Sequence, residues 1–553
     1  MGFVFQSISI FGRANRPSIQ LSTVPADPQG EFMLSRSNSS RRWPASTEAA
    51  ESLCPGPSLA PAAVCGWLGL AILLFFLQTL PYLSYRWVTD ESWYAAPAYS
   101  LLQGHGIANP AIGPNNQENH FDTRSCGSAI LLASAFRIFG TSQIPARLGS
   151  LLAGVAIIFF TYRLARDLIG QHGALIAMFI VATDNIVVLT SRTARPEALT
   201  AMAVFASLLL MQQYAWKAHI AWAFLSGLFM AMGTMFHVML LGYIVSLGIL
   251  VIVLDHRGGR FPLRGAISYS SGYLIGLLPF IFWVFTSAVG RISFREEYFG
   301  RAIGTPYWNR LLGEVHRYYD LLGLDLLHGH GLESIPVRLP IPLFFLASSF
   351  LLWKLRRQWF YLEMLLLVPT MLWFLYLTTT KSSRYFVLIT PIFALAIGAA
   401  VAATAAHRKL QRFLLIFSCL VVVAQMSANI FLLNGARKAD YNKVTEELRS
   451  VIPPGQTAYG TITFWLALHD HPYISYERTY PELAASRYGA HYFITGDRVM
   501  TYGFGGDMNS LADFNRRMAE VIAQSKLVGH FPDPYYGDLK VYELSAPRGN
   551  GRL

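Results

Sequence analysis

Long apolar stretches without charge alternate with short polar segments along most of the chain. No charged residue occurs between Glu51 and Arg86, and similar stretches recur at 265–290, 385–406 and 413–435. Each stretch is long enough to cross a hydrocarbon core about 30 Å thick, because a helix rises about 1.5 Å per residue. The pattern predicts an α-helical polytopic membrane protein.

Eleven segments have the pattern of transmembrane helices. The charge-free stretch 218–254 has 37 residues, about twice what the bilayer needs, so it predicts two helices with a turn near Gly233 to His237. The predicted spans are 62–84, 146–165, 172–190, 197–216, 219–235, 238–254, 266–288, 339–353, 360–379, 385–406 and 412–434.

A shorter apolar segment at 126–140 decides the orientation of the chain. It has 15 residues and contains Arg137, which favours an amphipathic helix in the membrane interface. The short loops on one side then carry twelve basic residues and those on the other side four. Because basic residues are retained in the cytoplasm, this count predicts a cytoplasmic N-terminus and an extracytoplasmic C-terminus.

Three regions follow from this topology. Residues 1–55 are rich in Ser, Pro and Arg and predict a disordered cytoplasmic tail, although a start site misplaced upstream of Met33 explains them equally well. Residues 56–436 form the transmembrane domain, with outer loops at 85–145 and 289–338. Residues 437–553 predict a small extracytoplasmic α/β domain. Its expected helices lie near 439–451 and 510–524, and its strands near 457–461, 490–495 and 538–544.

Composition agrees with a membrane protein, since 14% of residues are charged against about 25% in soluble domains. The net charge of +12 is explained by the cytoplasmic loops and by anionic lipid, so no nucleic-acid partner is expected. The four cysteines are scattered and predict neither a disulfide framework nor a zinc site.

The remaining ionisable residues gather on the predicted outer side. Arginines bind phosphate through bidentate hydrogen bonds, and a carboxylate can act as a general base. Taken alone, the acidic pair after the first span is equally well a solvated pair beside an aromatic belt, and the lone histidine is more often a turn residue. The candidate residues are Asp90, Glu91, Asp122, Arg124, Arg195, Glu197, His237, Lys381, Arg384 and Tyr385.

Two further features leave alternatives open. Asp184 lies inside an apolar helix, where a carboxylate indicates either a functional site or an ion pair with Arg192 or Arg195. His328, His330 and Glu333 are potential ligands, but they lie close together in sequence. A divalent metal is therefore possible, and no cofactor is assigned.

The Asp90-Glu91 pair, followed by a Tyr and by Leu-Leu-x-Gly, resembles the GT-C integral-membrane glycosyltransferases. The nearest patterns are the protein mannosyltransferase-like enzymes of glycosyltransferase family 39 and the aminoarabinose-transferase-like enzymes. Further matches lie at 138–154, 162–170, 195–197 and 381–391. The resemblance implies a GT-C fold with about eleven transmembrane helices plus interfacial helices.

The resemblance also implies transfer of a sugar from a polyprenyl-phosphate donor to a protein, lipid or glycan acceptor on the extracytoplasmic face. It makes Asp90, Glu91 and Glu197 the catalytic candidates, with Glu197 standing where the family more often has Asp. The other candidates are expected to bind substrate. The outer face offers one base and no separate nucleophile, which favours direct displacement with inversion.

Two other classes of protein fit the same spans. One is a transporter or flippase of lipid-linked saccharides, and the other is a non-catalytic protein of cell-envelope assembly. A transporter favours internal repeats and polar residues near the midplane, whereas the charged residues here collect at one interface. A bacterial inner membrane is the expected location, with the endoplasmic reticulum as the alternative.

Overall fold

The computed structural model describes residues 60–107, 109–112, 126–257, 263–286, 291, 307–321, 340–377, 383–476, 479–496 and 508–544. All of these residues belong to the unit Arg42–Leu553. The predicted tail at 1–55, a part of the outer loop at 85–145 and most of the outer loop at 289–338 lie outside the described residues.

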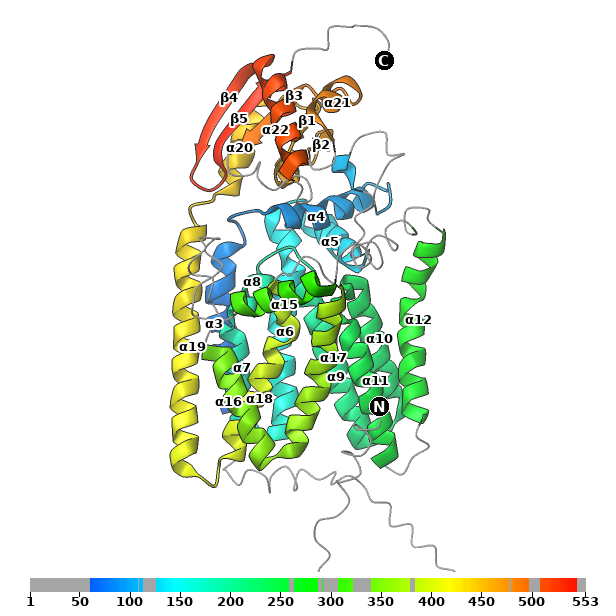
Figure 1. Cartoon of the computed structure of the whole chain (residues 1–553), viewed down its shortest axis with the longest axis vertical. Coiled ribbons are helices and arrows are strands. Elements are labelled where there is room, and N and C mark those ends of the chain that lie inside the picture. The colour runs from blue at the N-terminus through cyan, green and yellow to red at the C-terminus, as the bar shows by residue number, and fades with distance from the viewer. Residues whose placement is uncertain are drawn as a thin grey trace, which may run out of the picture. The chain divides into compact units, whose positions relative to one another are not determined.

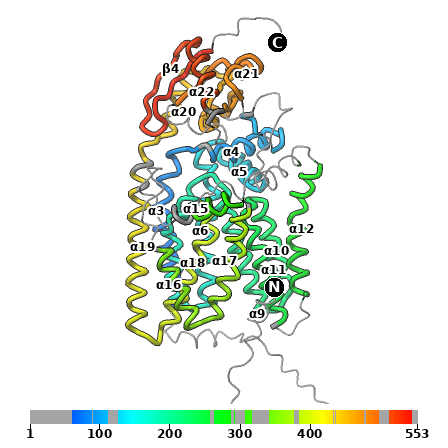
Figure 2. The backbone as a smooth tube through the Cα atoms, in the orientation of Figure 1, coloured from blue at the N-terminus to red at the C-terminus, as the bar shows by residue number. Residues whose placement is uncertain are grey.

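All eleven predicted spans are helical, and the chain is a multi-pass membrane protein. In the described ranges, seven helices are long and apolar enough to cross a bilayer: α3 with its 3₁₀ extension η2, α6, α9, α11, α12, α17 and α19. Their bounds are Pro61–Thr79 and Leu80–Tyr82, Gln143–Ile169, Glu197–Lys217, Leu241–Arg257, Arg264–Thr286, Arg357–Leu377 and Arg408–Ala436. They run alongside one another in Figures 1 and 2.

The other four predicted spans are a bent pair and three short helices. Helices α7 (Gln171–Thr183) and α8 (Asn185–Ser191) meet at an angle of 55° and together make an eighth candidate span. The short apolar helices are α10 (Ile220–Phe236), α16 (Pro340–Leu355) and α18 (Thr390–Ala403). The predicted turn between α10 and α11 is confirmed, because His237 separates α10 from the 3₁₀ turn η4 (Val238–Leu240).

Helix α5 (Cys126–Phe139) corresponds to the segment predicted to lie in the interface. Its 14 residues extend about 21 Å, which is less than the thickness of the hydrocarbon core. It packs against α4 (Thr89–Leu102), α6 and α10. Helix α18 has the same length, so the position of α5 in the interface stays a prediction.

Helices α10 and α12 approach each other closely through glycines. A Cβ atom at Gly227 would lie 2.1 Å from the carbonyl oxygen of Tyr269, and one at Gly272 would lie 2.0 Å from that of Phe224. Both separations are far below a van der Waals contact, so only glycine permits this packing. The opposite face of α12 is apolar and exposed, as expected for a helix that contacts lipid.

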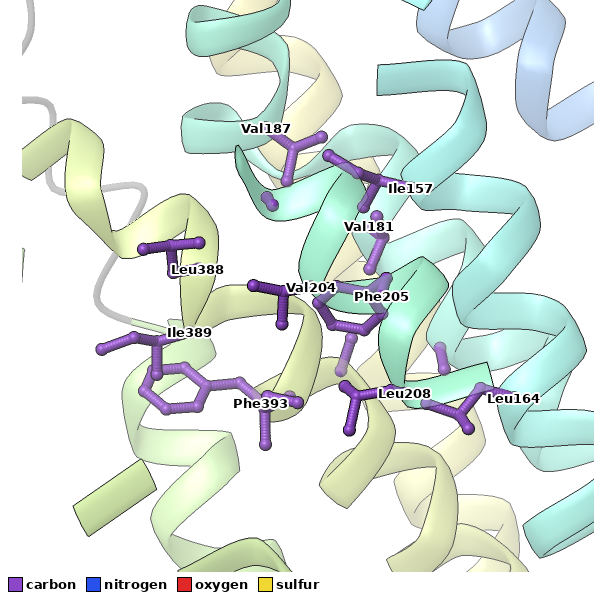
Figure 3. Packing of buried hydrophobic residues seen from close by; sticks show 14 of the residues in the cluster. Ile157, Leu164, Val181, Val187, Val204, Phe205, Leu208, Leu388, Ile389 and Phe393 are labelled. Carbon is purple, nitrogen blue, oxygen red and sulfur yellow. The ribbon is translucent and has the colours of Figure 1, made fainter. Parts of the chain in front are cut away.

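The core of the membrane region forms where α6, α7, α8 and α9 meet α18 and the 3₁₀ segment η8 (Ser383–Leu388). Figure 3 shows Val204, Phe205 and Leu208 of α9 packed among residues from these elements. Large apolar side chains therefore fix the middle of α9 and the start of α18 relative to each other.

Polar side chains form hydrogen bonds with the backbone groups at the break between α7 and α8. Asp184 accepts hydrogen bonds from the backbone N–H groups of Ile186 and Val187 at 3.0 and 2.9 Å, which caps α8. Asn429 of α19 donates to Gln78 of α3 and to the carbonyl of Thr183 at 2.7 and 2.9 Å. The carboxylate of Asp184 therefore has a structural role as a helix cap.

The C-terminal region contains a five-stranded sheet of order β2-β1-β3-β5-β4. Strand β1 (Ala458–Gly460) pairs in parallel with β2 (Tyr473–Ser475) and β3 (Tyr492–Gly496). Strand β5 (Gly537–Glu543) is antiparallel to β3 and to β4 (Lys526–Asp533). The helices are α20 (Tyr441–Val451), α21 (Pro481–Ser486) and α22 (Met508–Ala523).

The predicted elements of this region all occur, but β2, β4 and α21 were not predicted. Strand β2 has three residues, too few to show an alternating pattern. Strand β4 lies at the sheet edge, includes Gly529 and Pro532, and has an irregular register between Leu527 and Gly529. Glycine and proline at an irregular edge remove the usual strand pattern.

Candidate active site

Asp90 lies in the first turn of α4, immediately after the first span. The residue before this helix, Val88, is extended, and Asp90 and Glu91 follow in the first turn. Carboxylates are favoured at this end of a helix because the backbone N–H groups there are unpaired. The side chain of Asp90 is 54% exposed, so it is accessible for chemistry.

Arg195 links Asp90 to Glu197. It lies in the turn between α8 and α9, and its guanidinium forms ion pairs with both carboxylates. Its Nε atom donates to the two carboxylate oxygens of Glu197 at 2.9 and 3.2 Å. Burial by itself would lower the pKa of Arg195, but the two carboxylates raise it well above its ordinary value. Arg195 is therefore a permanent cation.

Arg384 lies beside this cluster, and Tyr385 and His237 contact each other next to it. The Nη1 atom of Arg384 is 3.8 Å from the Oδ2 atom of Asp90, and its side chain is 13% exposed. The rings of His237 and Tyr385 have centroids 5.4 Å apart. His237 also accepts a hydrogen bond from the backbone N–H of Met239 at 3.2 Å, so it caps a turn as well as facing Tyr385.

Glu91 has a different environment from Asp90. Its carboxylate is fully buried and accepts hydrogen bonds from the Nε and Nη2 atoms of Arg147, each at 2.7 Å. It also accepts the backbone N–H of Ala194 at 2.7 Å and that of Val88 at 3.2 Å. Glu91 thereby joins α4, α6 and the turn that carries Arg195.

Arg147 is a buried residue beside the site that the sequence analysis does not single out. Beyond Glu91, its Nη1 atom donates to the carbonyl oxygens of Tyr82 and Tyr85 at 3.0 and 2.7 Å. The available signal was a basic residue at the predicted outer end of a span, where cytoplasmic anchoring does not explain it. It was noticed only as part of the matching segment 138–154.

Five of the ten predicted site residues make one charged or aromatic cluster with Asp90, and these come from separate segments of the chain. They are Arg195, Glu197, His237, Arg384 and Tyr385. Asp122, Arg124 and Lys381 lie outside the described residues. Glu91 lies in α4 beside the cluster, and its side chain is fully buried.

The described part of the chain contains no group of three His, Cys, Asp or Glu side chains that could hold a metal ion. His328, His330 and Glu333 lie outside the described residues. Asp90 and Glu197 are both paired with Arg195, and a guanidinium competes with a divalent cation for the same oxygens. This donor set does not fit a metal.

The arrangement can bind an anion beside a base. Two guanidinium groups and one exposed carboxylate lie together, and Arg195 is held in place by a buried partner. Preorganised cations stabilise negative charge that develops on a leaving group, and a nearby carboxylate can accept a proton.

A family model matches part of the chain. Residues 125–285 match the model of the dolichyl-phosphate-mannose-protein mannosyltransferase family. No curated protein matches the chain in a sequence comparison.

Two solved structures are similar to the chain over most of its length. ArnT from Cupriavidus metallidurans in the apo state has 14% identity and a TM-score of 0.60, over 88% of this chain and 99% of that one. The same protein bound to undecaprenyl phosphate has 13% identity and a TM-score of 0.58, over 89% and 100%. The resemblance found in the sequence is confirmed, and the chain has the fold of the GT-C glycosyltransferases.

Proposed function

We propose that this protein transfers a sugar from a polyprenyl-phosphate donor to an acceptor on the extracytoplasmic face of the membrane. The observation that carries the proposal is the cluster of Asp90, Arg195, Glu197 and Arg384, in which one exposed carboxylate lies beside two guanidinium groups. The GT-C fold and the undecaprenyl phosphate bound by ArnT support a lipid-linked donor.

The reaction is a direct displacement at the anomeric carbon. Asp90 takes the proton of the acceptor hydroxyl, and the acceptor oxygen bonds to the anomeric carbon. The bond from that carbon to the phosphate oxygen breaks, and its electron pair stays on the phosphate. Arg195 and Arg384 stabilise the phosphate charge. One displacement inverts the anomeric configuration.

The other residues support these two roles. Glu197 is buried and holds Arg195 in position through two hydrogen bonds. Glu91 joins α4 to the turn that carries Arg195 and therefore positions the base and the cation relative to each other. His237 and Tyr385, together with Asp122, Arg124 and Lys381, are assigned to substrate binding.

The location and partners follow from the same proposal. The polyprenyl chain of the donor lies in the membrane beside the bundle, and the acceptor is a protein, lipid or glycan. The protein belongs in a bacterial inner membrane, with its N-terminus in the cytoplasm and its C-terminal region outside, because basic loops favour that orientation.

Transfer of radiolabelled sugar from synthetic polyprenyl-phosphate donors by the purified protein tests the proposal. We expect Asp90→Asn to lower the rate by about 10²- to 10⁴-fold, the usual contribution of a general base, and Glu197→Gln to lower it as well. Asp538→Asn, which changes a carboxylate of the C-terminal sheet that is 44% exposed, is the matched control and should be unaffected.

Three results bear on separate parts of the proposal. Wild-type activity in Asp90→Asn would remove this residue from the role of base. Retention of the donor's anomeric configuration in the product would exclude direct displacement. Loss of activity with a chelator, restored by a divalent cation, would show that a metal takes part.

A further inference from the structure

The structure assigns a positioning role to Tyr536 of the C-terminal sheet, which holds the segment that carries Asp90. This inference rests on the proposed function of Asp90. It makes the C-terminal region a component of the active site, although this region comes from the far end of the chain. The contacts that carry it lie between residues 86–92 and the turn at 533–537 that joins β4 to β5, called here the hairpin tip.

A single hydroxyl group binds both backbone polar groups of Trp87. The Tyr536 hydroxyl accepts the N–H of Trp87 at 2.8 Å and donates to the carbonyl oxygen of the same residue at 2.8 Å. Both side chains are buried, with exposed fractions of 0% and 1%. Water therefore cannot replace these hydrogen bonds without opening the interface.

The neighbouring residue is held in the same way. The N–H of Arg86 donates to the carbonyl oxygen of Ala439 at 2.8 Å. The guanidinium of Arg86 lies over the ring of Tyr535, 4.5 Å from its centroid. Two consecutive residues before α4 are thus fixed by the C-terminal region.

The hairpin tip is itself well ordered by local hydrogen bonds. The Oδ1 atom of Asp533 accepts the backbone N–H groups of Tyr535 and Tyr536, each at 2.7 Å. Gly537, which ends the turn, has a φ of 81° that favours glycine. The hydroxyl of Tyr536 is therefore presented from a defined position.

Trp87 transmits this restraint to the first turn of α4. Its indole Nε1 donates to the Oγ atom of Ser92 at 2.7 Å, and its ring lies 5.2 Å from the guanidinium carbon of Arg147. Ser92 and Glu91 follow Asp90 directly in this turn. The backbone of Asp90 is therefore fixed on one side by Trp87 and on the other by Glu91.

A Tyr536→Phe substitution isolates the hydroxyl. The ring remains packed against Tyr441 and Phe464, whose centroids lie 6.0 and 5.7 Å away, while both hydrogen bonds to Trp87 are lost. A displacement of about 1 Å at a reacting group costs on the order of 10²-fold in rate. We expect kcat to fall about 10- to 100-fold while KM for the polyprenyl-phosphate donor stays within about twofold.

Tyr459→Phe provides a matched control. Tyr459 is fully buried in the same region, and its hydroxyl donates to the carbonyl oxygen of Thr479 at 2.7 Å, away from α4. This variant loses a buried hydroxyl without touching residues 86–92, so its kcat should stay at the wild-type value. Ser92→Ala, which removes the bond from the indole of Trp87, should lower kcat in the same direction as Tyr536→Phe but less.

Hydrogen–deuterium exchange of residues 86–94 gives a second measurement that does not depend on activity. Exchange should be faster in Tyr536→Phe and unchanged in Tyr459→Phe. A wild-type kcat in Tyr536→Phe, or an equal loss in Tyr459→Phe, would overturn the inference. If the wild-type protein transfers no sugar from any donor, the proposed function fails, and the exchange of 86–94 alone decides whether Tyr536 holds this segment.

Discussion

Replacing Arg147 by methionine should destabilise the protein strongly. The side chain is fully buried and pairs with the fully buried Glu91. It also donates to carbonyl oxygens of the segment before α4, among them those of Tyr82 and Tyr85. Removing one partner of a buried ion pair costs about 3–5 kcal/mol because the other charge is left uncompensated. The orphaned carbonyl groups place Arg147→Met at the upper end of this range.

Glu91→Gln should cost less, although it breaks the same ion pair. The guanidinium of Arg147 keeps its backbone carbonyl acceptors, and the glutamine oxygen can still accept the N–H of Ala194. The remaining charge is better compensated here than in Arg147→Met, because Arg147 keeps four backbone carbonyl acceptors whereas Glu91 keeps two backbone N–H donors. The expected cost is therefore that of hydrogen bonds to a charged group, about 1.5–3 kcal/mol. The structure therefore predicts an asymmetry between the two halves of one ion pair.

Unfolding of the purified protein in mixed micelles, followed by tryptophan fluorescence against denaturant concentration, measures these differences. Arg163→Met is the matched control on the same helix. The Nη2 atom of Arg163 lies 3.6 Å from the Oδ2 atom of Asp167, and the Arg163 side chain is 33% exposed. Partly exposed pairs contribute about 0–1 kcal/mol. The reasoning is refuted if Glu91→Gln costs as much as Arg147→Met, or if Arg147→Met costs no more than Arg163→Met.

Two further measurements test the topology and the C-terminal region. In a variant without native cysteines, Glu520→Cys should react with an impermeant thiol reagent in intact cells, whereas Lys409→Cys should react only after lysis; the reverse pattern would invert the predicted orientation. Burial lowers the pKa of His469 below its ordinary value of 6.5, so the unfolded state binds a proton more readily. The contribution of the buried His469 side chain to the free energy of unfolding is therefore complete above about pH 6.5. It declines as the pH falls toward the lowered pKa. The gap in unfolding midpoint between wild type and His469→Gln should therefore narrow between pH 7.5 and 5.5, and a constant gap would contradict this assignment.

The membrane helices could be predicted because a long apolar run identifies a span without knowledge of the helices that pack against it. The same reasoning grouped Asp90, Arg195, Glu197 and Arg384 on one side, and these residues do meet. This grouping was possible because a charged residue is costly in a bilayer, so each one near the membrane indicates an ion pair, an anchor or a functional site.

The different environments of Asp90 and Glu91 could not be predicted from the sequence. Asp90 and Glu91 are adjacent and chemically alike, yet one side chain is 54% exposed and the other is fully buried against Arg147. Successive residues of a helix point in directions about 100° apart, so only the packing around α4 separates their roles. Asp184 likewise caps α8 only because α7 and α8 are separated by a bend at this residue, which the sequence did not predict.

The bond between Trp87 and Tyr536 joins residues that are 449 positions apart. During synthesis, the segment before α4 is therefore made long before the hairpin tip. On the predicted topology, the hairpin tip must also cross the membrane before it can reach Trp87. A chain that stops short of Tyr536 would carry every charged residue of the cluster and still lack the hydroxyl that binds both backbone groups of Trp87.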